Sequence, residues 1–291
     1  MNEYNFPRPE IEKPKVILPF ILFIVTVITT VAAGALYQGA NIFSNPSELA
    51  VGVPFSASLL LILGTHELGH FFASRRHGVS TTLPMFIPGP PIPPMIGTFG
   101  AVIRIKSQIT TKSALVEIGS AGPLSGFVIA LFITAWGLKL SILAPKLVSA
   151  GSLGLGSSLI FKLLSYMVFG PIPDSYDVVL HPMAFAGWIG MFVTAMNLLP
   201  IGQLDGGHLV YALIGTRHRV FSIAMVATLV VLGFFTWSGW FIWAALISFI
   251  GMWHPPIEDQ HIPMDARTRL ISAVTILVFI LTFIPEPFYI V

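Results

Sequence analysis

The stretch Gly64-Thr-His66-Glu67-Leu-Gly-His70 brings together three side chains that could do chemistry on one centre. Residues four apart lie on one face of a helix, so His66 and His70 can share a metal ion with Glu67 beside them. This spacing is typical of a zinc site in which the glutamate is the general base. The chain has no cysteine, so any metal must be held by His, Asp or Glu.

Two histidines do not complete a catalytic zinc site, which usually has three protein ligands and one open position. Asp205 is the favoured third ligand because helix-breaking Pro and Gly residues surround it at the expected inner end of an apolar segment. Irregular backbone at membrane depth is tolerated where protein covers it or where it lines a wet cavity. His208 is a genuine competitor. We expect surface or capping roles for the other acidic candidates, which are Glu117, Glu258, Asp259 and Asp265.

The composition places these residues in a membrane protein. Of the 291 residues, 55% are hydrophobic and only 10% are charged, whereas soluble chains carry about 25% charged residues. The net charge of +2 argues against a nucleic-acid binder, which needs clustered Lys and Arg. The 26 glycines and 23 prolines indicate irregular backbone inside the protein.

Spanning a bilayer takes about 20 apolar residues in a helix, and seven stretches qualify or nearly qualify. They are residues 16–37, 49–74, 114–143, 182–199, 220–236, 239–253 and 270–284. We expect residues 155–170 to form an interfacial or re-entrant helix. The sequence therefore predicts an all-α polytopic membrane protein with six to seven transmembrane helices. Residues 1–291 would form one domain, with a motif-bearing core over about 49–210 and extra helices at 16–37 and 220–284.

The basic residues predict an orientation. Placing the N-terminus in the cytoplasm puts 12 of the 15 Lys and Arg residues on that side, and leaves only Lys139, Lys146 and Lys162 on the other. The site would then face the cytoplasm. The polar lead before residue 16 shows no transit-like leader, which favours a prokaryotic plasma membrane. His218, His254 and His261 are expected in interfacial loops.

Residues 78–112 differ from the rest of the chain. Their proline-rich part cannot be helical, because proline removes backbone donors and clashes with the preceding turn. Residues 97–106 then alternate in polarity, which predicts a short membrane-associated strand or hairpin. A strand with a free edge beside the site could pair with an extended peptide. A loop that only packs on the helices is the alternative.

The two motifs together carry a resemblance to a known family. The pair His-Glu-Leu-Gly-His and Asn197-Leu-Leu-Pro200-Ile-Gly-Gln-Leu-Asp205-Gly-Gly resembles the site-2 protease family of intramembrane zinc metalloproteases. Ala121-Gly-Pro-Leu-Ser-Gly126 is similar to a turn of that family, and residues 87–102 resemble its branch with plastid homologues. The resemblance covers about residues 49–210. It implies one zinc ion per chain, held by His66, His70 and Asp205, with Glu67 as the base.

The function implied is hydrolysis of peptide bonds within or near transmembrane segments during regulated intramembrane proteolysis. Zinc lowers the pKa of bound water to about 7, and Glu67 would accept the proton as that water attacks. Asn197 could hold the substrate backbone or the oxyanion, or only make a helix-packing hydrogen bond. The expected partners are the lipid bilayer and a membrane-protein substrate with a transmembrane helix, and not nucleic acid. A metal-ion transporter and an inactive metal-binding scaffold are the alternatives.

Overall fold

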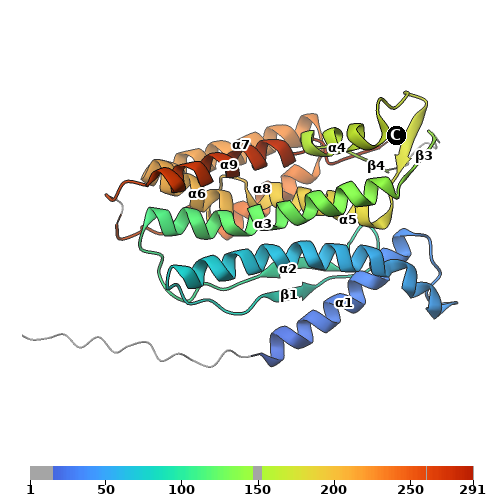
Figure 1. Cartoon of the computed structure of the whole chain (residues 1–291). Helices are drawn as coiled ribbons and strands as arrows, with labels where there is room; N and C mark the ends of the chain where they lie inside the picture. The colour runs from blue at the N-terminus through green and yellow to red at the C-terminus, as the bar shows by residue number, and fades with distance from the viewer. Residues whose placement is uncertain (1–15, 147–152, 260, 291) are drawn as a thin grey trace, which may run out of the picture.

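The computed structural model describes residues 16–146, 153–259 and 261–290 of the chain. Within them helices dominate, and α2, α3, α7 and α9 run along a similar direction while α1 crosses obliquely at one side (Figure 1). The helical elements are α1 (Ile17–Tyr37), η1 (Pro46–Gly52), α2 (Val53–Arg76), α3 (Lys112–Lys139), α4 (Leu159–Phe169), α5 (Pro182–Asn197), α6 (Asp205–Ile214), η2 (Gly215–Arg217), α7 (His218–Phe235), α8 (Gly239–Ile250) and α9 (Ala266–Thr282).

The described residues also contain six short strands, in three antiparallel pairs. The expected hairpin is confirmed: β1 (Met85–Pro88) pairs with β2 (Thr98–Val102), and Met85 lies opposite Val102. The other pairs join β3 (Ile142–Pro145) to β5 (Tyr176–Val179) and β4 (Leu153–Leu155) to β6 (Phe288–Ile290). The third expected span therefore ends earlier than residue 143, since α3 stops at Lys139 and β3 follows.

Four helical segments in the described part of the chain are long and apolar enough to cross a membrane: Ile17–Tyr37, Pro46–Arg76, Lys112–Lys139 and Asp205–Phe235. The expected count of six to seven is not confirmed. The reason is length, because α5, α8 and α9 have 16, 12 and 17 residues. At 1.5 Å per residue they reach roughly 18–26 Å, less than the ~30 Å of a bilayer core. The segment expected over 155–170 contains the short helix α4.

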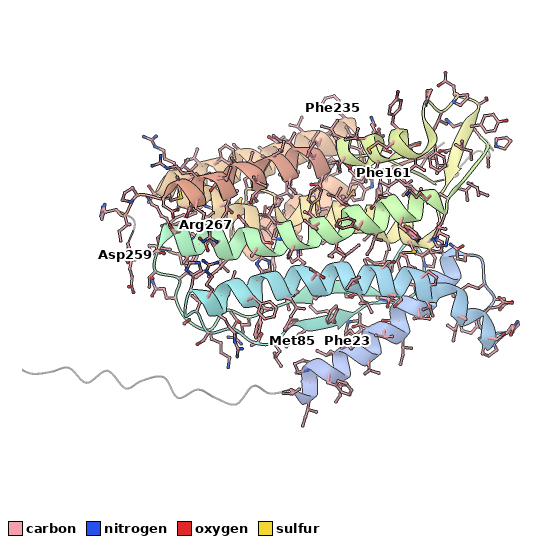
Figure 2. The ribbon with its side chains drawn as sticks, in the orientation of Figure 1. Phe23, Met85, Phe161, Phe235, Asp259 and Arg267 are labelled. Atoms are coloured by element: carbon pink, nitrogen blue, oxygen red, sulfur yellow. The ribbon has the colours of Figure 1, made fainter. Side chains whose placement is uncertain are left out.

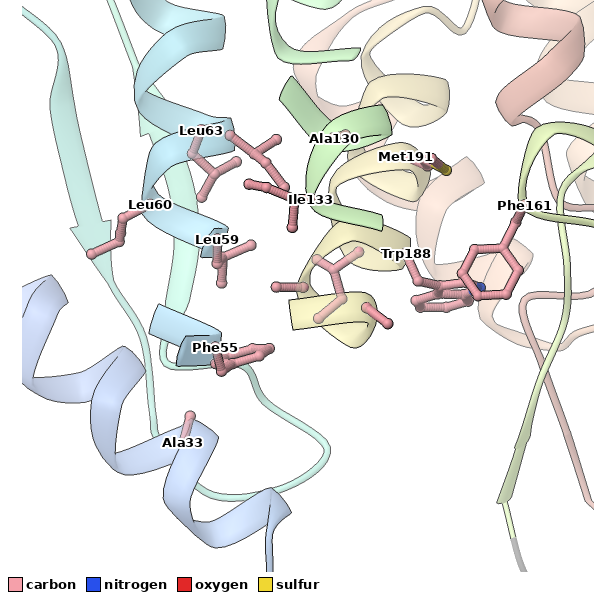
Figure 3. Close-up of a cluster of buried hydrophobic side chains, with 14 of the residues drawn as sticks. Ala33, Phe55, Leu59, Leu60, Leu63, Ala130, Ile133, Phe161, Trp188 and Met191 are labelled. Atoms are coloured by element: carbon pink, nitrogen blue, oxygen red, sulfur yellow. The ribbon is translucent and has the colours of Figure 1, made fainter. Parts of the chain in front are cut away.

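A hydrophobic core joins five of the helices (Figure 3). Phe55, Leu59 and Leu63 of α2 pack towards Ala130 and Ile133 of α3. The same cluster includes Ala33 of α1, Phe161 of α4, and Trp188 and Met191 of α5. On the other side of α2 the hairpin packs between α2 and α1, and the rings of Phe23 on α1 and Phe86 on β1 meet edge to face with their centroids 5.2 Å apart. Figure 2 shows Phe23 beside Met85. This packing fixes α2, α3 and the hairpin around one region.

Candidate metal centre

The helix α2 presents the first motif from its interior. His66, Glu67 and His70 expose only 5%, 7% and 7% of their surfaces, although they lie in a segment apolar enough to span a membrane. The helical spacing puts the two imidazoles together, and their Nε2 atoms are 3.1 Å apart. Ionisable groups at such depth are expensive, so three of them within five residues need compensating partners.

Asp205 reaches the same place from a later part of the chain. The helix α5 ends at Asn197, and an irregular turn leads to Asp205, the first residue of α6. Gly202 in that turn has φ +55°, a backbone conformation that favours glycine. Gly206 and Gly207 lie so close to the backbone of the turn that a Cβ on either would collide with its carbonyl oxygens. The Asp-Gly-Gly sequence thus lets α6 start tightly against the turn and aim Asp205 at α2.

The three side chains have the spacing of zinc ligands. The Oδ2 atom of Asp205 is 3.4 Å from Nε2 of His66 and 3.3 Å from Nε2 of His70. Tetrahedral zinc with ligand bonds of about 2.0–2.1 Å would hold its ligand atoms about 3.3 Å apart. Within the described residues, these three are the His, Asp or Glu side chains whose ligand atoms lie close enough to one another to hold a metal ion together. Two imidazoles and one carboxylate also suit zinc chemically.

A main-chain contact orients His70. Its Nδ1 lies 2.7 Å from the carbonyl oxygen of Ile118 on α3. A carbonyl can only accept, so Nδ1 carries the proton and donates, which leaves the Nε2 lone pair free for a metal ion. The identity of residue 118 does not matter for this contact. No side-chain pattern could therefore have predicted it.

Glycines on α3 make room for the site. A Cβ on Gly122 would overlap the imidazole ring of His70, and a Cβ on Gly126 would lie 3.1 Å from Cβ of His66. Gly119, one turn earlier, would place its Cβ 3.1 Å from Cβ of His208. The spacing of Gly122 and Gly126 is that of small residues at close helix contacts in membranes. Here the contact brings α3 directly against His66 and His70, two of the candidate metal ligands.

A cavity of about 260 Å³ opens beside the three groups. Glu67 lines it and its carboxyl group lies against the backbone of Ile103, which follows β2. The hairpin therefore forms one part of the cavity wall, through Ala101, Val102, Ile103 and Ile105, and α3 and α6 form another, through Ile118, Gly119, Asp205 and His208. Glu67 and the candidate ligands share one solvent-accessible space.

Asn197 also lies at this cavity. Its Nδ2 is 3.3 Å from Nε2 of His66, so its amide group faces the candidate metal ligands and not a neighbouring helix alone. The position of this amide brings it within reach of whatever group is bound beside His66.

The other acidic candidates lie elsewhere. Glu117 contacts Nε2 of His77 at 3.0 Å and Arg267 at 4.0 Å. Asp265 caps α9 by accepting a 2.8 Å hydrogen bond from the Thr268 N–H. Glu258 is exposed, and the N–H of Asp259 donates to the carbonyl oxygen of Thr110. Figure 2 shows Asp259 and Arg267 at one end of the bundle. His208 lines the cavity and is hydrogen-bonded to His254.

Comparison with known proteins gives the family. The model of Peptidase family M50 matches residues 54–238, which contain both motifs. The chain therefore belongs to this family, that of the site-2 proteases, and is a membrane-associated member of a zinc metalloprotease family. No solved structure matches the chain.

Several relatives with curated descriptions are chloroplastic zinc metalloproteases. The chain is 30% identical over 246 residues to "Probable zinc metalloprotease EGY1, chloroplastic" of Arabidopsis thaliana, and the aligned region covers 75% of this chain and 44% of that protein. It is 28% identical over 253 residues to "Probable zinc metalloprotease EGY2, chloroplastic" of the same plant, covering 84% and 44%. The EGY1 protein of Oryza sativa subsp. japonica is 30% identical over 234 residues, covering 70% and 40%. The chain spans less than half the length of these relatives.

Proposed function

We propose that this chain is an intramembrane zinc metalloprotease that hydrolyses peptide bonds within or near transmembrane segments of membrane proteins. The observation that carries the proposal is the meeting of His66, His70 and Asp205 at zinc-ligand spacing, beside the carboxyl group of Glu67. Membership of the family and the zinc metalloprotease relatives support it. In this proposal residues 1–291 act as a single membrane domain.

The three converging side chains are the proposed ligands of one zinc ion. When bound, zinc supplies a Lewis acid that lowers the pKa of water and polarises the peptide carbonyl. Glu67 takes the proton of the attacking water and then delivers it to the nitrogen of the leaving amine, so the C–N bond breaks as an amine forms. Asn197 holds the substrate carbonyl or its oxyanion with the N–H groups of its amide, a role supported by its place beside His66.

The substrate must reach the cavity in an extended form, because helical carbonyls are tied up in hydrogen bonds. In the described part of the chain β2 pairs only with β1, so its other edge has no strand partner. The wall formed by Ala101, Val102 and Ile103 continues this strand into the cavity. We propose that an unwound substrate segment adds to this edge through main-chain hydrogen bonds.

We also propose that the N-terminus and the site face the cytoplasm, or the stroma in a plastid membrane. The position of 12 of the 15 basic residues supports this orientation. The prokaryotic plasma membrane stays a prediction, since the named relatives are chloroplastic. Regulated intramembrane proteolysis likewise stays a prediction about the role of the cleavage.

The test is cleavage of a single-span substrate by purified protein, compared with Glu67→Gln. We expect Glu67→Gln to keep its zinc and to lose cleavage by about 10²–10⁴-fold, because only the general base is removed. Glu117→Gln is the matched control, since Glu117 pairs with His77 away from the cavity, and it should cleave normally. Metal content is measured on all three proteins.

The same proteins separate the alternatives. Cleavage by Glu67→Gln at the normal rate would reject Glu67 as the base. Zinc uptake into sealed vesicles by a variant that cleaves nothing would favour a transporter. Zinc retention without cleavage or transport by the wild type, over a set of single-span substrates, would favour a metal-binding scaffold.

A further inference from the structure

His208 is a titratable residue of the cavity that the proposed mechanism leaves without a role. It follows Asp205 by three positions on α6, so it lies close to the metal position, and it lines the same 260 Å³ cavity. Its Nδ1 is 2.7 Å from Nε2 of His254, which comes from the segment after α8. The His254 ring is stacked on Tyr211 at 4.2 Å, which holds it in place.

The hydrogen bonds of this pair fix where the protons are. The Nδ1 of His254 is 2.7 Å from the carbonyl oxygen of Pro255, which can only accept, so this nitrogen carries a proton. In a neutral imidazole the other nitrogen then has a lone pair. The Nε2 of His254 therefore accepts, and the Nδ1 of His208 donates to it. The Nε2 of His208 is left as a bare acceptor.

Two observations support this assignment. Burial lowers the pKa of His254, which keeps its ring neutral and excludes the doubly protonated form that would reverse the bond to His208. The Nε2 of His208 has no hydrogen-bond partner in the described residues, and it is not among their fully buried unpaired atoms. Since His208 lines the cavity and its Nδ1 is occupied, this nitrogen is open to the cavity.

The cavity would present this acceptor to a bound peptide. A peptide added to β2 forms main-chain hydrogen bonds on the edge that faces the strand, and its other edge carries N–H and C=O groups with no strand partner. His208 belongs to the wall formed by α3 and α6, whereas β2 and its continuation form a different wall. An acceptor on the α6 wall complements an N–H of the peptide.

We propose that Nε2 of His208 binds a main-chain N–H of the substrate, and that His254 is the positioning residue that keeps this lone pair free. This inference rests on the proposed function, because it names a contact to the substrate of the same site. The competing outcomes are that His208 is a fourth metal ligand or that its role is purely structural.

The experiment replaces single peptide N–H groups of a synthetic single-span substrate by ester oxygens, one position at a time around the cleaved bond. An ester removes the donor with little change of shape. In the wild type we expect one position to lose about 3–10-fold in kcat/KM, the effect of one neutral hydrogen bond. In His208→Leu the amide substrate should be slower by a similar factor, and the ester at that position should cost nothing further.

Two more variants test folding and the role of His254. His208→Gln keeps an acceptor carbonyl and should recover part of the preference for the amide. His254→Phe keeps an aromatic ring on Tyr211 but removes the acceptor, so it should raise KM more than it lowers kcat and reduce the penalty of the ester. Binding of the amide and ester peptides to Glu67→Gln, without turnover, should show the same ratio of dissociation constants.

The outcomes separate this inference from the proposed function. If the wild type cleaves no peptide, the proposed function fails. If the wild type cleaves and His208→Leu shows the same ester penalties at every position, the contact to His208 is wrong. Loss of zinc from His208→Leu would make it a metal ligand instead. Equal losses in the Leu and Gln variants, without any change in the ester penalties, would make its role structural.

Discussion

The inner helices α2 and α3 differ from α1 in how much of each is enclosed by protein. In the most apolar stretches of these segments, 50% and 56% of the residues of α2 and α3 are buried, but only 22% of those of α1. All three are apolar enough to span a membrane. Among these three helices the buried ionisable side chains are His66, Glu67 and His70, which all lie on the enclosed helix α2.

The difference has a physical reason. A charged or strongly polar group in the bilayer needs a partner, and lipid offers none. The surrounding protein supplies partners, such as the carbonyl of Ile118 on α3 for His70 and the carboxylate of Asp205 on α6 for both histidines. The outer helix α1 has apolar side chains exposed along much of its length, including Ile17, Phe20 and Ile28. The site thus depends on how closely α2 and α3 pack, and α1 should tolerate change.

The largest effect is expected for Gly122→Ala on α3. Its Cβ would overlap the ring of His70, so the imidazole must move by about 1 Å or more. A displacement of that size at a catalytic centre costs about 10²-fold in rate. We expect cleavage to fall by at least that factor and bound zinc to decrease, measured as turnover and metal content of the purified variant.

Gly64→Ala on α2 is the matched control for that substitution. Its Cβ would meet only the Phe86 ring at 3.5 Å, an ordinary contact. Alanine also favours a helix over glycine by about 1 kcal/mol. Gly64→Ala should keep full zinc and activity. If Gly122→Ala behaved in the same way, the packing of α3 would not determine the position of His70.

The next largest effect is on stability, where truncation of a buried apolar residue should cost more than truncation of an exposed one. Leu59 of α2 is fully buried, and truncation to alanine should cost about 2–5 kcal/mol through the cavity it leaves. Ile28 of α1 is 62% exposed, and Ile28→Ala should change stability by less than about 0.5 kcal/mol. Thermal unfolding in the same detergent measures both. Equal effects would mean that α1 is as tightly packed as α2.

Much of the site could be predicted from the sequence because its elements are local. The spacing of His66 and His70 defines a shared helix face, and the glycines around Asp205 indicate a broken helix end. The hairpin was also predictable, because the prolines exclude a helix and the polarity of residues 97–106 alternates. These patterns act over a few residues, where backbone geometry determines the result.

The remainder depends on contacts between distant segments. The bond from His254 to His208 joins residues 46 positions apart, and the sequence suggested only a loop position for His254. The contact of His70 with Ile118 uses a carbonyl group, which every residue has. The count of six to seven spans is not confirmed, since apolar runs such as residues 182–199 continue past the point where the helix ends, at Asn197. Composition reports polarity, whereas the length of a helix also depends on the turn that follows it.

Only a small effect is expected where α1 touches the hairpin. The hydroxyl of Thr29 donates a 2.6 Å hydrogen bond to the carbonyl oxygen of Gly97, just before β2. Hydrogen bonds between elements of membrane proteins contribute about 0.6 kcal/mol on average. Thr29→Val should therefore lower the melting temperature only slightly and leave zinc content unchanged.

Thr228→Val on α7 is the control, because the hydroxyl of Thr228 bonds only to the carbonyl oxygen of Ala224 in its own helix. The difference between the two variants isolates the link between α1 and the hairpin. A loss of cleavage in Thr29→Val with normal stability would show that α1 helps to place β2 beside the cavity. A loss of stability as large as that of Leu59→Ala would place α1 among the enclosed helices, because one hydroxyl could then not account for it.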